Sequence, residues 1–134
     1  MFIALYDACS LYSNIGRDFL IRAALEGTVI ARWTERILEE VFDHLTANRP
    51  DLDQDKLART RARMNDAILD VSVTGYDGLA DALEIPDPGD RHVLAAAIRC
   101  GAQVIVTENI RDFPEDILTP LGIEAKTSDD FLVD

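Results

Sequence analysis

The chain has 134 residues, of which 25 are acidic and 13 basic, giving a formal net charge of −12. That length suits a single domain over residues 1–134, and a composition of 48% hydrophobic and 28% charged residues excludes a disordered acidic tail. No apolar run reaches the roughly 20 residues that cross a bilayer and no secretory leader is evident, so we expect a cytoplasmic protein. Because the acidic balance repels phosphate, we do not expect a uniformly basic surface for nucleic acid.

The first sixty residues alternate strand and helix patterns. An apolar run over residues 2–6 predicts a buried strand that opens into a loop at Asp7. Residues 17–26 predict a short helix, and residues 28–31 a second short strand. Thr34 is a suitable cap for a helix that continues to about Ala47.

A third helix is expected to begin at Asp51 or Asp53 and to carry a cluster of basic residues. The cluster consists of Lys56, Arg59, Arg61 and Arg63. It is either a solvated helix face or a contact for nucleic acid, and both interpretations stay open. The surrounding charge is uneven, because residues 1–63 hold 10 acids and 9 bases whereas residues 64–134 hold 15 acids and 4 bases.

The second half continues the alternation. Residues 71–73 are a weak strand candidate, and the turn 87–90 begins a helix that Gly101 closes. That helix is apolar all round over residues 93–98, which is typical of a buried helix.

A strand at 103–106, a polar loop at 107–113, a strand near Ile123 and a final helix capped by Ser128 complete the predicted elements. The whole pattern predicts an α/β fold of three layers, α/β/α, with a mainly parallel central sheet.

Acidic residues recur where such a fold places its functional sites. The carboxyl ends of parallel strands lie at one edge of the sheet, and Asp7 and the loop with Asp112 follow two predicted strands. Asp90 lies in the first turn of the apolar helix. On the helix from Thr34, Glu39 and Glu40 flank the apolar stripe symmetrically, so periodicity does not choose between them.

Each acid taken alone has an ordinary explanation as a solvated or helix-capping carboxylate. Together, acids from four separate elements predict a site for a hard cation such as Mg²⁺ or Mn²⁺, whose preferred ligands are oxygens. A zinc site is not expected, because the two cysteines and two histidines lack the required spacing.

The stretch DPGDRHVLAAAIRCGAQVIVTENIRDFP resembles the pattern DPDDRHVLAAAI…ADxIVTxNxxDFP of PIN-domain proteins, in the branch of VapC-like toxin ribonucleases. YDACSLYSNIGRDFL, WTERILEEV and GIEAKTSDDFL resemble further segments of that branch. The likeness extends over residues 4–132 and implies the PIN fold.

The resemblance also implies the site. It assigns metal binding and catalysis to Asp7, Glu40, Asp90 and Asp112. Many PIN domains carry an aspartate where this chain has Asn109, so either Asn109 or Asp112 completes the set. The resemblance gives substrate contacts to Thr107, Asn109, Arg17 and Arg91, with loop bracing as the other role of the two arginines. We interpret His92 as a packing or capping residue, and Trp33 and Phe113 as core residues.

The implied activity is hydrolysis of RNA phosphodiester bonds by metal-activated water, leaving a 5′-phosphate and a 3′-hydroxyl, in a toxin that a protein antitoxin inhibits. Relatives in this branch commonly form homodimers, and they continue through another helix where this chain ends at FLVD, so the C-terminal helix is expected to be truncated. Two alternatives stay open. One is an RNA-processing PIN nuclease without an antitoxin, and the other is a non-catalytic RNA-binding or protein-interaction module.

Overall fold

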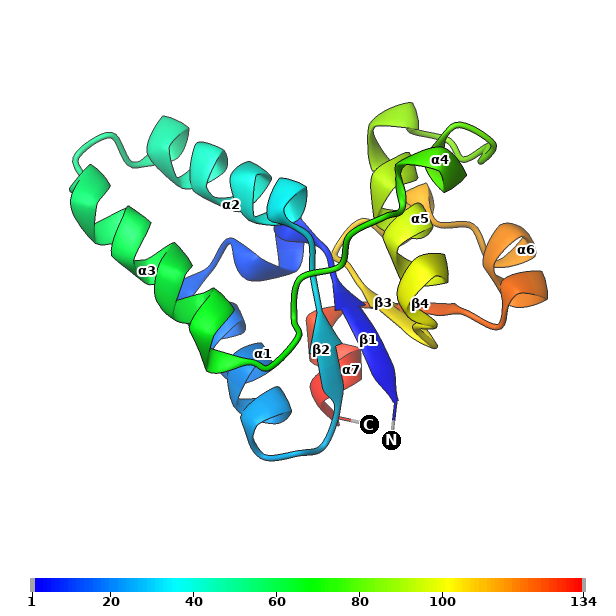
Figure 1. The fold of residues 1–134 in the computed structure, drawn as a ribbon, viewed down its shortest axis with the longest axis horizontal. Coiled ribbons are helices and arrows are strands. Elements are labelled where there is room, and N and C mark those ends of the chain that lie inside the picture. The colour runs from blue at the N-terminus through cyan, green and yellow to red at the C-terminus, as the bar shows by residue number, and fades with distance from the viewer. Residues whose placement is uncertain (1, 134) are drawn as a thin grey trace.

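A computed structural model describes residues 2–133, which fold around a four-stranded parallel sheet (Figure 1). The strands are β1 (Ile3–Tyr6), β2 (Ile30–Arg32), β3 (Val104–Val106) and β4 (Glu124–Lys126), in the order β2-β1-β3-β4. Leu5 in the central strand β1 pairs with Arg32 on one side and Ile105 on the other. The α/β class is confirmed, and the sheet of these residues is parallel throughout.

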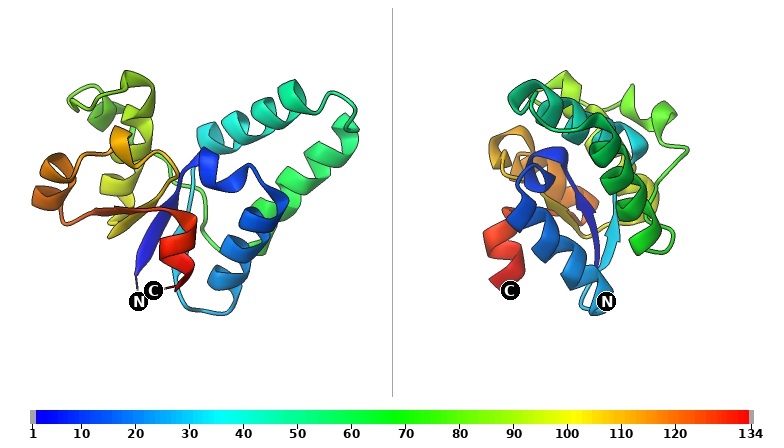
Figure 2. Two further views of the ribbon diagram at one scale, coloured as in Figure 1. Left: turned by 180° about the vertical axis from the view of Figure 1, so that it is seen from behind. Right: turned by 90° about the vertical axis from the view of Figure 1, so that its left-hand side faces the viewer.

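Helices cover both faces of the sheet, as Figures 1 and 2 show. Within residues 2–133 they are α1 (Asn14–Leu25), α2 (Glu35–Asn48), α3 (Gln54–Ala67), α4 (Asp77–Ala80), α5 (Arg91–Cys100), α6 (Glu115–Leu118) and α7 (Ser128–Val133). Helix α5 packs on β1 and β3 with α4 against it, whereas α1 and α7 pack together on the other side. The antiparallel pair α2 and α3 forms an arm at one side of the molecule. The expected three-layer arrangement is therefore present.

Capping side chains explain where the helices begin. Ser13 accepts a hydrogen bond from the Gly16 amide at 3.0 Å, so α1 begins three residues before the predicted Arg17. The predicted cap Thr34 accepts from the Ile37 amide at 3.0 Å. Of the two candidates for α3, Asp53 is the cap.

Two local predictions were wrong. Residues 71–73 do not form a strand of the sheet, because only a single parallel bridge joins Trp33 to Ser72. Ser128 does not cap α7, since it lies inside the helix and its hydroxyl donates to Glu108 at 2.6 Å. The Asp130 amide of that helix instead donates to the Thr127 hydroxyl, at 3.2 Å.

The core lies between the sheet and its two helical layers. On the α1 and α7 side, Tyr6 contacts Trp33 and Phe131, and its hydroxyl donates to the Leu20 carbonyl at 3.0 Å. On the other side, residues 92–97 of α5 are buried all round, as the apolar pattern predicted. Trp33 and Phe113 are fully buried, which confirms them as core residues.

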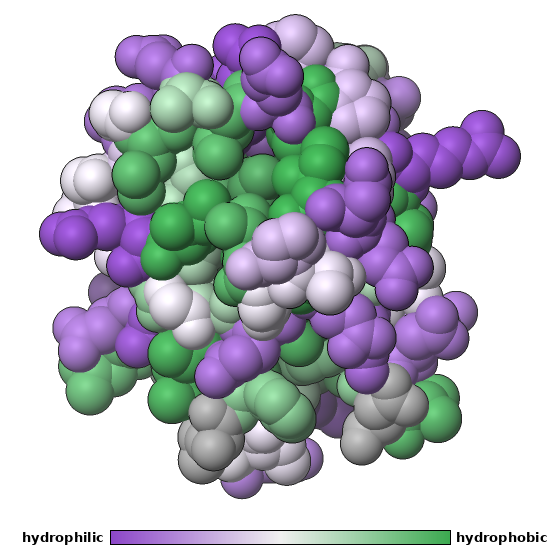
Figure 3. All heavy atoms as spheres, turned by 90° about the vertical axis from the view of Figure 1, so that its right-hand side faces the viewer, coloured by the Kyte–Doolittle hydropathy of each residue, from purple (hydrophilic) through white to green (hydrophobic). Residues whose placement is uncertain are grey.

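Apolar side chains also line a hollow beside β4, α6 and α7. Its walls include Phe2, Phe19, Phe113, Leu118, Ile123 and Phe131. Figure 3 shows apolar side chains gathered in the middle of one face, within a polar surround. Within residues 2–133, no helix has both the length and the apolar character needed to cross a membrane.

Candidate metal centre

Asp7 is a buried carboxylate at the carboxyl end of the central strand. Its side chain, in a residue only 4% exposed, accepts hydrogen bonds from the Ala8 amide at 2.8 Å and the Thr107 hydroxyl at 2.9 Å. The first bond caps the 3₁₀ turn η1 (Ala8–Leu11), and the second comes from the residue that follows β3. Adjacent parallel strands thus bring together two residues that are 100 positions apart in sequence.

The surroundings of Asp7 disfavour its negative charge. Burial raises the pKa of its carboxyl above the ordinary value, and the negative charge of Glu40 adds to the increase. The hydrogen bonds from Thr107 and Ala8 lower the pKa and offset part of this effect. A bound cation would favour the ionised form that desolvation penalises.

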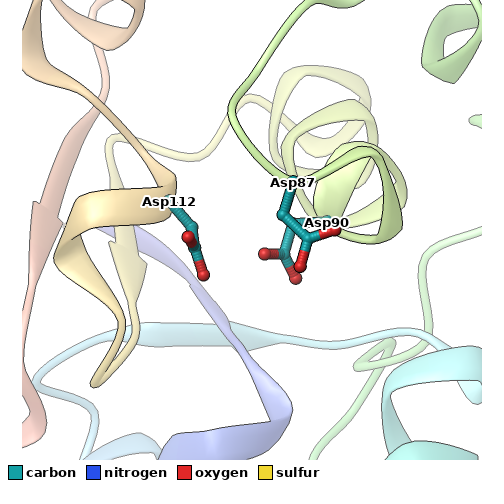
Figure 4. Close-up of side chains that lie close together, drawn as sticks. All are labelled: Asp87, Asp90 and Asp112. Atoms are coloured by element: carbon teal, nitrogen blue, oxygen red, sulfur yellow. The ribbon is translucent and has the colours of Figure 1, made fainter.

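Three further carboxylates meet beside the start of α5. Asp87 caps the 3₁₀ turn η2 (Pro88–Asp90), Asp90 ends it, and Asp112 ends the turn η3 (Ile110–Asp112). One oxygen from each carboxylate lies within 4.8 Å of the others, and the side chains point toward one another in Figure 4. These acids come from two loops at the same edge of the sheet.

The pKa of Asp90 records the crowding of negative charge. Desolvation raises it most, followed by the negative charge of Asp7 and by a hydrogen bond with Asp112, and together these causes bring it to about 7. Near neutral pH the metal-free site therefore holds a proton that an isolated aspartate would have released.

The structure distinguishes the two neighbouring glutamates of α2. Glu39 is exposed, whereas Glu40 is partly buried and close enough to Asp7 to raise the pKa of that carboxyl. Glu40 Oε1 lies 2.8 Å from His92 Nε2 and 4.0 Å from Arg36 Nε. Glu40 is thus the acid of α2 that faces the other site carboxylates.

His92 contacts the site through Glu40. The ring is 2% exposed, and its Nε2 lies 2.8 Å from Glu40 Oε1. This distance is short enough for an ion pair, but the angles are not those of a hydrogen bond. The packing role predicted for His92 agrees with its burial, but the sequence reasoning missed this contact. No spacing rule reveals it, because the two residues belong to different helices.

Asp87 is another residue that the sequence reasoning did not place in the site. It was interpreted only as part of a turn, and its side chain does accept from the Gly89 amide at 2.8 Å. The DPGD sequence was the available signal, since it places two aspartates three residues apart around a tight turn. Asp87 also raises the pKa of Asp90, which shows that it contributes to the local field.

The predicted substrate residues have different surroundings. The exposed Asn109 donates its amide to the Thr107 hydroxyl at 3.1 Å. The Arg17 guanidinium is buried against the Leu11 and Tyr12 carbonyls, at 2.8 and 3.4 Å, and also donates to the Asn14 side chain. These contacts brace the loop between β1 and α1. Arg91 is partly buried, and its Nε has no hydrogen-bond partner among residues 2–133.

The basic cluster lies on α3, in the arm away from the sheet. Arg61 forms an ion pair with Glu35 at 2.9 Å, so part of the cluster's charge is neutralised locally. The other three bases of the cluster lie on the same helix and are exposed; they are Lys56, Arg59 and Arg63.

The donor set of the site suits a hard divalent cation. Of the predicted ligands, Asp90 and Asp112 lie in the group that also contains Asp87, whereas Asp7 and Glu40 lie outside that group and are linked to it through the negative charges that raise neighbouring pKa values. All of these residues offer carboxylate oxygens, the ligands that Mg²⁺ and Mn²⁺ prefer. The arginine ion pairs of residues 2–133 fall on Asp18, Glu35, Glu40 and Asp51. The Asp87, Asp90 and Asp112 group therefore gathers negative charge that a cation would neutralise.

Comparison with known proteins gives two matches. A family model described as PIN domain matches residues 4–111. A protein of Mycobacterium tuberculosis named "Putative ribonuclease VapC50" is 60% identical over 60 residues, which cover 45% of this chain and 35% of that protein. The aligned part is thus about a third of the relative's length.

Proposed function

The chain belongs to the PIN-domain family, and on that basis we propose that it is a ribonuclease that requires Mg²⁺ or Mn²⁺ and hydrolyses RNA phosphodiester bonds. One observation carries the proposal. Asp87, Asp90 and Asp112 each place one carboxylate oxygen within 4.8 Å of the others, and desolvation, followed by the negative charge of Asp7 and by the contacts with Asp112 and Asp87, raises the pKa of Asp90 to about 7. The 60% identity over 60 residues to a protein named "Putative ribonuclease VapC50" supports the same activity.

Asp7, Glu40, Asp90 and Asp112 would hold the divalent ion. The ion supplies activation of the attacking water and neutralisation of charge on the phosphodiester. Hydrogen bonds from Ala8 and Thr107 hold Asp7 in place, and the buried His92 ring restrains Glu40. We expect Asn109 and Arg91 to contact the RNA beside these acids and Thr107 and Arg17 to support the site loops, with products ending in a 5′-phosphate and a 3′-hydroxyl.

The test is cleavage of RNA in Mn²⁺ by the parent protein and by two variants of adjacent residues. Glu40→Gln removes a proposed ligand, and Glu39→Gln removes the same charge from the exposed position beside it. We expect EDTA and Glu40→Gln to abolish cleavage and Glu39→Gln to retain it, with circular dichroism showing both variants folded. Equal cleavage by Glu40→Gln and the parent would refute the proposal.

We also propose that the chain is the toxin of a toxin–antitoxin pair. A cognate protein antitoxin would inhibit it, and it would assemble as a homodimer. The relative's name, "Putative ribonuclease VapC50", supports this branch of the family. Expression should arrest growth unless Glu40 is replaced, and a small protein that copurifies and restores growth would be the antitoxin. Cleavage without growth arrest or such a partner would favour an RNA-processing nuclease.

A second candidate is a non-catalytic RNA-binding or protein-interaction module. Asn109 favours it, because many PIN domains carry an aspartate at that position and an amide is a weaker ligand for a hard cation. Titration calorimetry with Mn²⁺ separates the two candidates. A degenerate module would bind no Mn²⁺ at millimolar concentration, whereas the nuclease would bind it and lose that binding with Asp90→Asn.

A further inference from the structure

Tyr12 and His44 form a stacked pair of rings. Their centroids are 3.8 Å apart and their planes differ by 6°, so the rings lie face to face. Tyr12 is half-buried and follows η1, whereas His44 is exposed on α2. Asn48 donates to the His44 carbonyl at 2.9 Å, one turn further along the same helix. Tyr12 is therefore the half-buried member of the pair, and His44 is the member that is open to solvent.

Both rings lie on elements that carry acids of the candidate metal centre. His44 is four residues after Glu40, so the two side chains share one face of α2. Tyr12 is five residues after Asp7, at the end of the turn that Asp7 caps. Figure 1 shows the segment after β1 running beneath α2, which brings the two rings together.

The field at Tyr12 agrees with this placement. Burial raises the pKa of the Tyr12 phenol most, and the thiolate form of Cys9 and the carboxylates of Glu40, Asp7 and Asp90 raise it further. The stacked pair thus lies at the border of the acidic group. A phosphate is repelled by such a border unless a cation intervenes, but a neutral nucleobase is not.

Five other aromatic side chains are less suited to hold a base near these acids. Tyr6, Trp33 and Phe113 are fully buried in the core. Phe2 precedes β1 and so lies at the opposite edge of the sheet, and Phe19 lies on α1. An unpaired base gains free energy by stacking on an exposed ring, whatever its identity.

We propose that the stacked pair of Tyr12 and His44 binds one unpaired nucleobase of single-stranded RNA, next to the phosphate held at the acidic site. The base extends the stack on the exposed His44 ring. This subsite rests on the proposed ribonuclease function, and it positions the strand without reading base identity. It acts mainly on substrate binding, because neither ring belongs to the proposed metal ligands.

The test compares a short single-stranded RNA with the same RNA lacking one base at successive positions. With intact RNA, His44→Ala should raise KM about tenfold, the range expected from losing one stacked base, while kcat stays within about threefold. His44→Phe keeps a flat ring without an imidazole and should stay near the parent. With the base missing at the stacked position, His44→Ala should have no further effect. Phe19→Ala is the control for loss of an exposed ring elsewhere.

Three outcomes would overturn the subsite: an unchanged KM in His44→Ala, an equal penalty with the abasic RNA, or a His44→Phe variant as weak as His44→Ala, which would indicate a charge contact. A binding arm keeps this test separate from the ribonuclease proposal. RNA containing 2-aminopurine is titrated in Ca²⁺, and its fluorescence should be quenched on stacking by the parent and not by His44→Ala. Quenching without any cleavage would refute the nuclease and keep the subsite, whereas cleavage without quenching would do the reverse.

Discussion

Asp90→Asn should stabilise the metal-free protein at alkaline pH while removing its response to Mn²⁺. Folded Asp90 keeps its proton to about pH 7, whereas in the unfolded chain an aspartate releases it near the ordinary value of 3.8. Between these values the native state binds more protons, so raising the pH lowers the free energy of unfolding. Asparagine resembles the protonated form, because it is neutral and its amide can donate to Asp112, and it does not titrate, so we expect its stability to lack this pH dependence.

The magnitude follows from the same pKa. From pH 5 to pH 7 the titration of one group corresponds to a ceiling of about 3 kcal/mol. Asp90 is only partly buried, so solvent screening reduces the expected effect to about 1–2 kcal/mol. The advantage of Asp90→Asn over the parent in EDTA should therefore grow by about this amount between pH 5 and pH 8.

Urea unfolding in EDTA at the two pH values measures the effect, and Asp66→Asn on the exposed surface of α3 is the matched control. Repeating the series in Mn²⁺ should reverse the order, since a ligand that binds only the native parent stabilises it by mass action. If Asp90→Asn has no greater advantage at pH 8 than the control variant, the pKa of Asp90 is not raised in the metal-free protein, and the reasoning from desolvation and crowded carboxylates is refuted.

Three further predictions concern the side chains that support the site. Thr107→Val removes the hydroxyl that donates to buried Asp7 at 2.9 Å, so it should lower the free energy of unfolding by about 1–3 kcal/mol and weaken Mn²⁺ binding in calorimetry; unchanged affinity would contradict the supporting role. His92→Leu removes the ring that restrains Glu40 and should lower Mn²⁺ affinity about tenfold, whereas a loss of folding stability with normal affinity would make His92 a core residue only. Thr34→Ala removes the cap of α2 and should lower the free energy of unfolding, measured in urea, by about 1 kcal/mol. A decrease of less than about 0.3 kcal/mol would mean that the Ile37 amide finds another partner.

Local signals in the sequence were sufficient for much of the fold. Thr34 was predicted to cap α2 because its hydroxyl is well suited to accept from an amide in the first turn, and it does so. Gly101 was predicted to end α5, and its φ of +72° is the left-handed conformation that glycine adopts at low cost. The strand predicted at residues 71–73 is absent from the sheet. Its β-branched residues favour a strand, but strand pairing depends on a neighbouring strand that the local sequence does not specify.

Only part of the site could be predicted, because its contacts join distant elements. The rule that parallel strands end at one edge was enough to expect Asp7 near the loop after β3. Helical periodicity placed Glu39 and Glu40 symmetrically, and the choice depends on contacts with α5 and β1 that no spacing within α2 encodes. The stacked rings were missed for the same reason, since Tyr12 and His44 belong to separate elements.

The net charge of −12 decides how RNA is expected to meet this chain. The acids at the sheet edge repel phosphate, the exposed bases Lys56, Arg59 and Arg63 lie on the arm helix α3, and Arg61 is engaged by Glu35. Under the proposed function the divalent ion supplies the local positive charge and the stacked rings supply a contact that is insensitive to salt. RNA affinity should therefore fall more on removing Mn²⁺ than on raising NaCl from about 50 to about 200 mM, and the opposite order would place most of the bound phosphates on α3.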